Sequence, residues 1–504
     1  MPPREIELKF QLLPGSEAIL RAGDVFGHTP QNRHQVTTYH DTPDNLLLTS
    51  GLSLRIRQEK DRFLQTVKSR DDGIGLANSR NEWEWPVTDG SPEVEHLAAV
   101  PALASIAGRI TGRLVPVIVT DIWRTSCLHV VKGDCAAEAS LDIGTVSSGA
   151  MSLPICELEL ELKDGKVAAL YRLGVQLAQS APMWISAESK AARGWSLRHG
   201  HGSGASVLPK PKIAKKTSAA AGLHQIIGAL LGHLRDNIAP TLSGEPEALR
   251  QMRGALRQLR AVFRLFAPLL NLDEIARFTA PLRQFAQTFG RARDWDVFCG
   301  QTLPAVMADL PDLDWTDLSA LADTERAAAR AAVHDAICGP HLTHLILDIA
   351  LCSETCAATP ADGGTKQLTR HLAKVAPALL DTFEAKARQA GRHPGRLSMV
   401  ALHDFRKALD RLNVAVRFLG SAYPKSAVAA FRKRSDAVRD IIGAANDADV
   451  TKALAKRLTT GGSRDLSASI AALATWADQR QAQSLTDLKP AARRFQEASQ
   501  FWQT

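Results

Sequence analysis

The chain has 504 residues, of which 61 are lysine or arginine and 53 are aspartate or glutamate, and its formal net charge is +8. This length exceeds what one hydrophobic core usually organises, so we expect two or three domains, and the positive charge favours an anionic partner. No stretch approaches the roughly 18 consecutive apolar residues of a membrane span and the N-terminus has no signal-peptide core, so we expect a cytoplasmic protein that neither crosses nor binds a membrane.

Short runs of alternating polar and apolar residues fill the first 200 residues, as expected of antiparallel strands. The run EIELKF places Glu5, Glu7 and Lys9 on one face of a strand and three apolar residues on the other. Similar runs predict strands at 4–11, 34–40, 51–58, 61–69, 81–87, 115–130, 136–143 and 155–163. Helical patterns occur near 16–22, 93–107 and 165–179.

Charged strand faces of both signs recur through this region. The basic faces carry Arg55, Arg57, Arg62, Lys68 and Arg70, and the acidic faces carry Glu82, Glu84, Glu138, Asp142, Glu157, Glu159 and Glu161. One such face is usually solvated, but several of them favour a closed barrel with a charged lumen and an apolar exterior packed against helices. Carboxylates in the lumen would ligate Mg²⁺ or Mn²⁺, while the cations would neutralise phosphates. Neither charge set would tolerate enclosure without the other.

A basic linker rich in glycine, serine and proline is predicted at 201–217. It separates a first domain at 1–200 from a second at 218–504, where leucine and alanine recur at helical spacing. QMRGALRQLRAVFRLF at 251–266 resembles DFRKALDRLNVAVRFL at 404–419, and a glycine-aspartate segment follows each. We therefore expect an α+β protein: an N-terminal eight-stranded antiparallel barrel with flanking helices, then an all-α domain of two related bundles, at about 218–350 and 366–504.

Basic residues form a stripe on the first of these repeated helices and a looser one on the second. A solvated helix face is the usual explanation, but few acidic partners lie four residues away, so the stripe suits phosphate oxygens. The residues of both stripes are Arg250, Arg253, Arg257, Arg260, Arg264, Arg406, Lys407, Arg411 and Arg417.

The N-terminal motifs also carry a family resemblance. EIELKF resembles the ExExK signature of the CYTH superfamily, the triphosphate tunnel metalloenzymes, and YHDTPDNLLLTSGLSLRIR, LQTVK, NEWEWPV, LDIG, CELELELKDG and SKAARG follow in the family's order. The resemblance spans about residues 1–200. It implies an eight-stranded tunnel that binds a triphosphate with a divalent metal and hydrolyses a phosphoanhydride bond. Bacterial proteins that join this domain to a helical one resemble the chain most, and they are inorganic triphosphatases.

The same resemblance implies roles for individual residues. Metal ligands would be Glu5 and Glu7, with Glu159 and Glu161 opposite, and Asp142 or Glu157 would serve a second metal or hold the attacking water. Glu159, or its neighbour Glu157, would orient or deprotonate that water, and Lys9 would contact the reacting phosphate. The phosphate-binding residues would be Lys9, Arg55, Arg57, Lys68, Arg124, Lys190 and Arg193, with Arg80 and Lys163 as further members. His40 lies beside a turn and is not expected to be catalytic, whereas Asp41 is expected to cap backbone amides.

Residues 218–504 resemble the CHAD domain, a helical module associated with binding inorganic polyphosphate. The resemblance rests on the two arginine-bearing helices and on the segments RDWDV and NDADV. The first repeat departs from the family, because Arg250 stands where a histidine is common, while the second keeps His403.

These observations predict a metal-dependent enzyme that hydrolyses inorganic triphosphate to diphosphate and phosphate, with polyphosphate as partner of the helical domain and of the protein in the cell. Three alternatives remain. The tunnel would accept a nucleoside or thiamine triphosphate or support adenylate cyclase activity, the whole chain would be a non-catalytic polyphosphate-binding protein, or it would bind DNA. Nucleic acid is the weakest of these partners because the sequence has no helix-turn-helix or other motif that recognises DNA.

Overall fold

The computed structural model describes residues 4–23, 25–26, 29–70, 73, 75–131, 135–200, 202, 204–208, 213–270, 272–358, 368–459 and 466–503. The chain divides into two compact units, the first made of 1–207, 231–248 and 336–355, and the second of 208–230, 249–335 and 356–504. Within the predicted linker, residues 201, 203 and 209–212 lie outside the described residues. The domain boundaries drawn from the sequence stay predictions.

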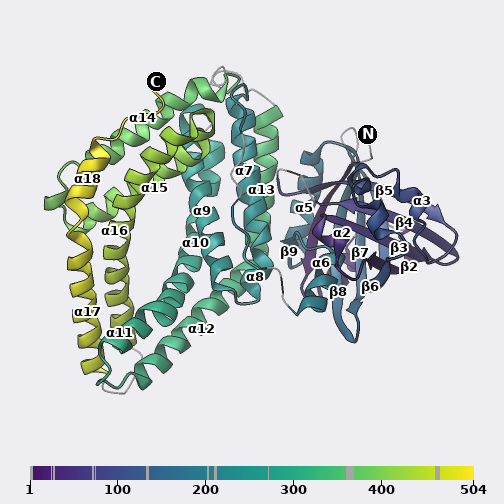
Figure 1. Cartoon of the computed structure of the whole chain (residues 1–504), viewed down its shortest axis with the longest axis horizontal. Coiled ribbons are helices and arrows are strands. Elements are labelled where there is room, and N and C mark those ends of the chain that lie inside the picture. Colours follow the sequence, from purple (N-terminus) through teal and green to yellow (C-terminus); the bar gives the residue numbers. More distant parts are fainter. Residues whose placement is uncertain are drawn as a thin grey trace. The chain divides into compact units, whose positions relative to one another are not determined.

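The first unit is built on an antiparallel barrel (Figure 1). Its described strands are β1 (Arg4–Leu12), β2 (Gln31–Asp41), β3 (Leu52–Glu59), β4 (Arg62–Ser69), β5 (Asn78–Val87), β6 (Val115–Val131), β7 (Cys135–Ser148), β8 (Met151–Gly165) and β9 (Met183–Ser186). Neighbours follow the order β5-β4-β3-β2-β6-β7-β8-β1-β9, and a further pairing of β1 with β5 closes eight of the strands into a ring. The predicted eight-stranded barrel is therefore confirmed.

Strand β1 closes the barrel with one edge shared between two partners. Its first half, Arg4–Glu7, pairs with β5, and its second half, Lys9–Leu12, pairs with β9. The opposite edge pairs with β8 over Glu7–Gln11. The barrel therefore closes at the ExExK segment of β1. Its pairing with β8 sets Glu7 opposite Glu161 and Lys9 opposite Glu159.

The apolar faces of the strands point outward onto helices, as predicted. Leu54 and Val67 pack with the helical pieces α3 (Val94–Leu97), η1 (Pro101–Leu103) and α4 (Ala107–Ile110), and the two tryptophans of β5 join this cluster. The sequence predicted one helix over 93–107. Three short pieces form instead, because a proline at the start of η1 offers no amide hydrogen and disfavours helical backbone at the preceding residue.

Short helices and one longer helix complete the barrel's surroundings. They are α1 (Ser16–Ala22), α2 (Leu46–Thr49) and α5 (Val167–Ser180). Gly174 of α5 lies against β1, since a Cβ there would be 3.3 Å from the ring of Phe10. A larger residue at this position would push α5 away from the strand that carries the ExExK motif.

Helix α6 (Lys190–His199) packs on the inner face of the barrel, which the sequence did not predict. Ser189 caps it by accepting a hydrogen bond from the Ala192 amide. Ala191, Trp195 and Leu197 pack on an apolar cluster that includes Ile118 of β6. Side chains alternate along β6, so Ile118 points to the same side as Arg124, which faces the lumen. Helix α6 therefore fills part of the lumen.

The second unit is built from helices in its described residues, with an isolated bridge between Ser218 and His371. The helices that follow α6 in the chain are α7 (Ala219–Asp236), α8 (Ile238–Leu242), α9 (Pro246–Phe266), α10 (Leu272–Val297), α11 (Leu303–Asp309), α12 (Thr316–Cys338), α13 (Pro340–Ala358), α14 (Leu372–Ala390), α15 (Met399–Leu419), α16 (Lys425–Thr459), α17 (Ser467–Leu485) and α18 (Leu488–Gln496). Parts of α7, α9, α12 and α13, together with α8, cluster with the first unit. The predicted all-α C-terminal region is confirmed.

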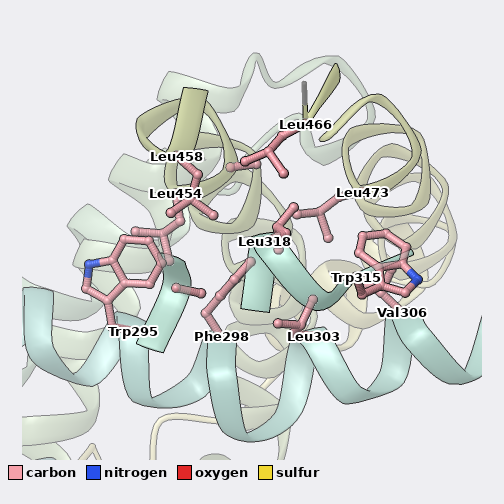
Figure 2. Packing of buried hydrophobic residues seen from close by; sticks show 12 residues of the cluster. Trp295, Phe298, Leu303, Val306, Trp315, Leu318, Leu454, Leu458, Leu466 and Leu473 are labelled. Carbon is pink, nitrogen blue, oxygen red and sulfur yellow. The ribbon is translucent and has the colours of Figure 1, made fainter. Parts of the chain in front are cut away.

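One core cluster ties early and late helices of this unit together (Figure 2). Trp295 near the end of α10 and Phe298 directly after it pack with Leu454 and Leu458 of α16 and with Leu473 of α17. The contact joins the two sequence repeats through buried apolar surface, which is the main source of stability in helical bundles.

Among the described residues, no single helix is both long and apolar enough for a membrane crossing, although the bent pair formed by α12 and residues 340–355 of α13 meets the length and composition requirement together.

Candidate active site

A cavity of about 260 Å³ occupies the barrel lumen, and its walls carry charges of both signs. Acidic residues come from β1, β3, β5, β7 and β8, and basic residues from β1 to β6, β8 and α6. The charged lining residues are Glu5, Glu7, Lys9, Arg33, Arg55, Arg57, Glu59, Lys68, Arg80, Glu82, Glu84, Arg124, Glu138, Glu159, Glu161, Lys163 and Lys190.

On the β1 side of the cavity, Glu5 lies between two cations. Its carboxylate accepts hydrogen bonds from Lys68 Nζ and Arg80 Nε, each at 2.8 Å. Burial favours the neutral acid, but the two cations outweigh it and lower the pKa of Glu5 to about 2. Glu5 is therefore a carboxylate at any physiological pH.

Glu7 lies one step further along the same face. Its Oε1 accepts a hydrogen bond from Arg80 Nη2 at 2.9 Å and a longer one from Asn78 Nδ2 at 3.4 Å. The residue is 4% exposed. Arg80 thus bridges both glutamates of the ExExK motif, and their charges raise the pKa of its guanidinium despite burial.

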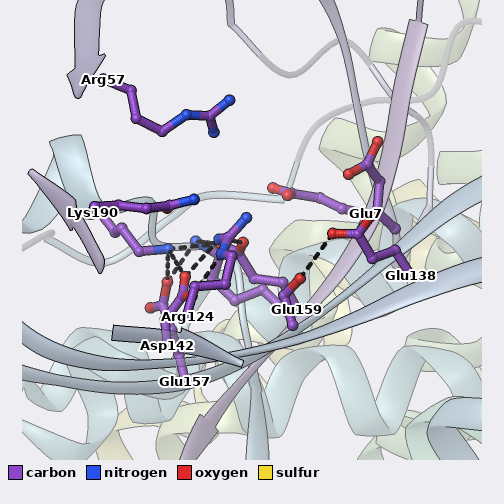
Figure 3. Close-up of polar contacts among 12 residues, drawn as sticks. Glu7, Arg57, Arg124, Glu138, Asp142, Glu157, Glu159 and Lys190 are labelled. Carbon is purple, nitrogen blue, oxygen red and sulfur yellow. Dashed lines mark hydrogen bonds and ion pairs between the residues drawn. The ribbon is translucent and has the colours of Figure 1, made fainter. Parts of the chain in front are cut away.

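The floor of the lumen holds a dense ion-pair group (Figure 3). Lys190 Nζ lies 2.6 Å from Asp142, 2.5 Å from Glu157 and 2.9 Å from Glu159. Lys9 Nζ lies 2.8 Å from Glu159. Arg124 contacts Asp142 and Glu159, each at 2.6 Å, and Arg193 lies 3.1 Å from Glu157. Three carboxylates and four cations therefore form one largely buried layer, in which the positive groups outnumber the negative ones by one.

Electrostatics favour the ionised forms of Asp142, Glu159 and Lys190. Burial opposes ionisation of Asp142 and Glu159, yet Arg124 and Lys190 hold the pKa of Asp142 below its usual value, and Lys190 and Lys9 hold that of Glu159 well below it. The same carboxylates raise the pKa of Lys190 against the effect of burial.

Asp142, Glu157 and Glu159 also have the spacing of a metal site, because they offer carboxylate oxygens within 4.8 Å of one another. Hard oxygen donors suit Mg²⁺ and Mn²⁺. A cation bound here would share these carboxylates with Lys190 and Arg124. Among the described residues, the predicted ligands Glu5, Glu7 and Glu161 are not part of any such group of three.

Like Arg55, which lies 3.6 Å from Glu82, Arg57 is only loosely paired. Its nearest carboxylates are Glu59 at 3.5 Å and Glu84 at 3.7 Å, both beyond good hydrogen-bond distance. Burial lowers the pKa of Arg57, and repulsion from Arg55 and Arg124 lowers it further. Figure 3 shows its guanidinium standing apart from the ion-paired floor. An anion in the cavity would relieve this repulsion.

The remaining predicted tunnel residues lie at the same cavity or directly behind it. Lys163 Nζ lies 2.6 Å from Glu161, whose pKa is raised by burial. Arg55 lies 3.6 Å from Glu82. Asp142 and Glu157 are not among the lining residues but contact Lys190, which is, and Arg193 contacts Glu157. The fold therefore brings the whole predicted tunnel set into one region.

In the second unit, corresponding residues of the two repeats approach one another. Arg253 of α9 and Arg406 of α15 are 153 positions apart in sequence, and so are Asp294 and Asp447. Burial lowers the pKa of Arg253, with Asp294 opposing and Arg406 adding to the effect; burial raises the pKa of Asp294, and Asp447 raises it further. Two arginine-aspartate pairs thus share one site, one pair from each repeat.

Other residues of the predicted basic stripes have mixed surroundings. Arg257 lies 3.3 Å from Asp410, and Lys407 lies 3.3 Å from Asp404. Burial lowers the pKa of Arg260, and Arg264, Arg283 and Arg411 lower it further, so this part of the stripe is a cluster of mutually repelling cations. Arg250 makes interactions of its own and is exposed.

Two family models match the chain, the CYTH domain over residues 3–195 and the CHAD domain over residues 225–456. The chain contains a CYTH domain followed by a CHAD domain. An inorganic triphosphatase from Haemophilus influenzae is 32% identical over 198 residues, which cover 38% of this chain and 55% of that protein. The chain thus spans about half the length of this curated relative.

Solved structures support the fold of the helical region. The CHAD domain of the plant Ricinus communis superposes with a TM-score of 0.51 at 21% identity, covering 60% of this chain and 99% of that one. A Hippeastrum protein described as a putative adenylyl cyclase with dominant triphosphatase activity matches with a TM-score of only 0.30 at 20% identity, covering 39% of this chain and 96% of that one.

Sequence reasoning placed Glu82 and Glu84 on a charged face of the CYTH lumen but gave neither a role, and it missed Arg33 and Glu59, which line the cavity. Glu82 lies 3.0 Å from Lys68, and Glu84 accepts a hydrogen bond from Thr66. Both glutamates alternate with tryptophans in NEWEWPV, and that spacing was a usable signal. Asn78 gave no signal, because its importance arises from contacts with residues far away in sequence. Asp41 caps the amides of Thr42, Leu47 and Leu48 as predicted.

Proposed function

We propose that the CYTH lumen binds inorganic triphosphate with a divalent cation and hydrolyses it to diphosphate and phosphate. The observation that carries the proposal is the lumen itself, a small cavity with charged residues on all sides. Lys68, Arg80 and Lys190 lie within 3.0 Å of a carboxylate, whereas Arg55 and Arg57 lie 3.5 Å or more from theirs. The lowered pKa of Arg57 also favours an added anion. The homology to an inorganic triphosphatase agrees with this substrate class.

The lining favours an inorganic substrate over a nucleoside triphosphate. A nucleobase needs an apolar or aromatic surface. Among the described lining residues the aromatic one is Tyr39, while Trp83 and Trp85 pack on the outside of the barrel. We therefore rank nucleoside and thiamine triphosphates, and adenylate cyclase activity, below tripolyphosphate.

The proposed chemistry needs fixed positive charge, because a triphosphate repels a nucleophile and the leaving diphosphate gains charge as the bond breaks. Arg55, Arg57 and Lys68 would bind the phosphate oxygens. Mg²⁺ or Mn²⁺ would supply charge neutralisation and a more acidic bound water. The family resemblance implies Glu5 and Glu7 with Glu159 as its ligands, while the carboxylates that already lie within 4.8 Å of one another are Asp142, Glu157 and Glu159.

Two carboxylates of β8 are suited to different steps. Glu159 remains ionised because Lys190 and Lys9 lower its pKa, so it would orient the attacking water. Glu161 has a raised pKa and is the better proton acceptor of the two. Lys9, held by Glu157 and Glu159, would contact the reacting phosphate.

For the CHAD domain we propose polyphosphate binding by the basic residues of α9 and α15. The support is the clustering of Arg260 with Arg264, Arg283 and Arg411, whose mutual repulsion a polyanion would remove. Such binding would weaken steeply with salt. Association with polyphosphate would also set where the protein resides, which we propose is the cytoplasm.

The test compares phosphate release from tripolyphosphate, ATP, thiamine triphosphate and long-chain polyphosphate, each with Mg²⁺ and with Mn²⁺. The variants are Glu5→Gln combined with Glu7→Gln, and Glu95→Gln on α3 as the matched control. We expect tripolyphosphate to be the best substrate, with activity lost in the double variant and retained in the control. A better organic substrate, or full activity in a folded double variant, would refute the proposal.

A further inference from the structure

A buried chain of hydrogen bonds links α7 to a glutamate of the ExExK motif. Arg235 Nη1 donates to Asn78 Oδ1 at 2.9 Å, and Asn78 Nδ2 donates to Glu7 Oε1 at 3.4 Å. Arg235 and Asn78 are each 6% exposed. All three residues belong to the first compact unit. A side chain 157 positions away from Asn78 in sequence is therefore part of the surroundings of the proposed metal site.

The order of donors and acceptors in this chain follows from Arg235. A guanidinium donates hydrogen bonds and accepts none, whereas an asparagine amide has one accepting and one donating end. Arg235 therefore attracts the Oδ1 end of Asn78, which leaves the donating Nδ2 end facing Glu7. With the amide reversed, a carbonyl oxygen would face the Glu7 carboxylate and repel it.

The backbone around Asn78 is also held in place. Arg235 Nη1 donates to Leu76 O at 2.7 Å, and the Ala77 amide donates to Tyr171 Oη at 3.4 Å. Gly232, one turn before Arg235 on α7, permits a close approach, since a Cβ there would lie 2.9 Å from Gly75 O. These contacts fix the backbone just before β5, the strand whose Asn78 and Arg80 side chains bind Glu7.

We propose that Arg235 is a positioning residue for the lumen, which fixes the orientation of the Glu7 carboxylate through Asn78. The inference rests on the proposed function, because it assumes that Glu7 holds the metal. Residues that orient a metal ligand typically change metal affinity by about 10- to 100-fold when they are removed. Arg235 touches neither substrate nor metal in this arrangement.

The experiment measures Mn²⁺ affinity directly by electron paramagnetic resonance on the full-length protein. The variants are Arg235→Gln, Asn78→Leu, the double variant and Arg235→Lys. Thr343→Val is the matched control, because it removes another buried hydrogen bond of the first unit, from Thr343 Oγ1 to Met183 O at 3.0 Å. This bond does not involve Glu7, Asn78 or Arg235. Thermal unfolding of each variant reports the loss of stability separately.

We expect Arg235→Gln and Asn78→Leu each to weaken Mn²⁺ binding by about tenfold. The double variant should be no weaker than either single variant, because both break the same chain. Arg235→Lys, which still donates to Asn78, should regain part of the affinity, and Thr343→Val should match the wild type. With tripolyphosphate, the metal concentration needed for half-maximal rate should rise while the rate at saturating metal stays unchanged.

Several results would overturn the inference. Equal Mn²⁺ affinity in Arg235→Gln and Thr343→Val would show that Arg235 only holds α7 in place. Fully additive losses in the double variant would show that the two residues act independently. Should Arg235→Gln fail to fold, wild-type Mn²⁺ affinity in Asn78→Leu would overturn the inference, because the chain runs through Asn78. A wild-type protein that hydrolyses no triphosphate and binds no Mn²⁺ would instead refute the proposed function, and with it the role proposed for Arg235.

Discussion

Replacing Arg57 by glutamine should separate substrate binding from folding in the CYTH lumen. The substitution removes the cation whose nearest carboxylates lie at 3.5 and 3.7 Å and whose pKa is lowered by burial and by Arg55 and Arg124. Ion pairs this long lack a good hydrogen bond and offset little of the cost of burying the guanidinium. The folded protein therefore loses little and is relieved of repulsion, so the unfolding temperature should stay unchanged or rise slightly.

Arg57→Gln should instead weaken the binding of tripolyphosphate. A hydrogen bond from a charged donor contributes about 1.5–3 kcal/mol, which corresponds to a roughly 10- to 150-fold higher KM for tripolyphosphate. Arg124→Gln should behave differently, because Arg124 contacts Asp142 and Glu159 at 2.6 Å. Breaking such buried pairs costs about 3–5 kcal/mol and should lower the unfolding temperature.

Steady-state phosphate release and differential scanning calorimetry on the same preparations provide the comparison. The reasoning would be wrong if Arg57→Gln unfolded at a lower temperature, as Arg124→Gln should, and kept the wild-type KM. Arg57 would then belong to the structural ion pairs of the barrel rather than to the substrate site.

Three further predictions follow from the lumen and the helical repeats. Lys190→Met should destabilise the barrel by about 3–5 kcal/mol at neutral pH. In the wild type the pKa values of Asp142 and Glu159 are depressed, so these carboxylates stabilise the folded state at pH values above about 4, the ordinary carboxyl pKa, and this stabilisation is lost at lower pH. In urea unfolding, the free energies of unfolding of wild type and Lys190→Met should therefore become more similar as the pH falls below about 4. Gly194→Ala places a Cβ 2.4 Å from the Ile118 side chain and should cost about 1–3 kcal/mol in thermal unfolding, whereas Gly108→Ala, with open space around it, should not. Arg253→Ala with Arg406→Ala should weaken polyphosphate binding and reduce its salt dependence, and unchanged affinity by titration calorimetry would contradict the CHAD proposal.

The strands of the barrel were predictable because their signal is local. Alternation in EIELKF fixes which side of β1 faces the lumen, and Leu8 and Phe10 are indeed buried on the other side. The helix at 16–22 was predicted with its observed bounds. Strands β7 and β8 are longer than predicted, because their outer ends pair with each other where the residues no longer alternate.

Features that depend on distant contacts were not predictable in the same way. Helix α6 is short and has many small and charged residues, and its position becomes evident only when Gly194 is seen against Ile118. The roles of Lys190 and Arg193 came from family resemblance rather than from spacing. The link from Arg235 to Asn78 has no sequence signature, since each residue alone looks like an ordinary polar residue in its element.

The pairing of Arg253 and Asp294 with Arg406 and Asp447 has a consequence for the direction of a bound ligand. A peptide or nucleic acid has two different ends, and a site that treats both ends alike would bind it in two non-equivalent ways. An inorganic phosphate chain reads the same from either end. Matching charges contributed by both repeats would therefore let such a chain enter in either sense with nearly equal affinity, doubling the number of productive orientations without any additional contact.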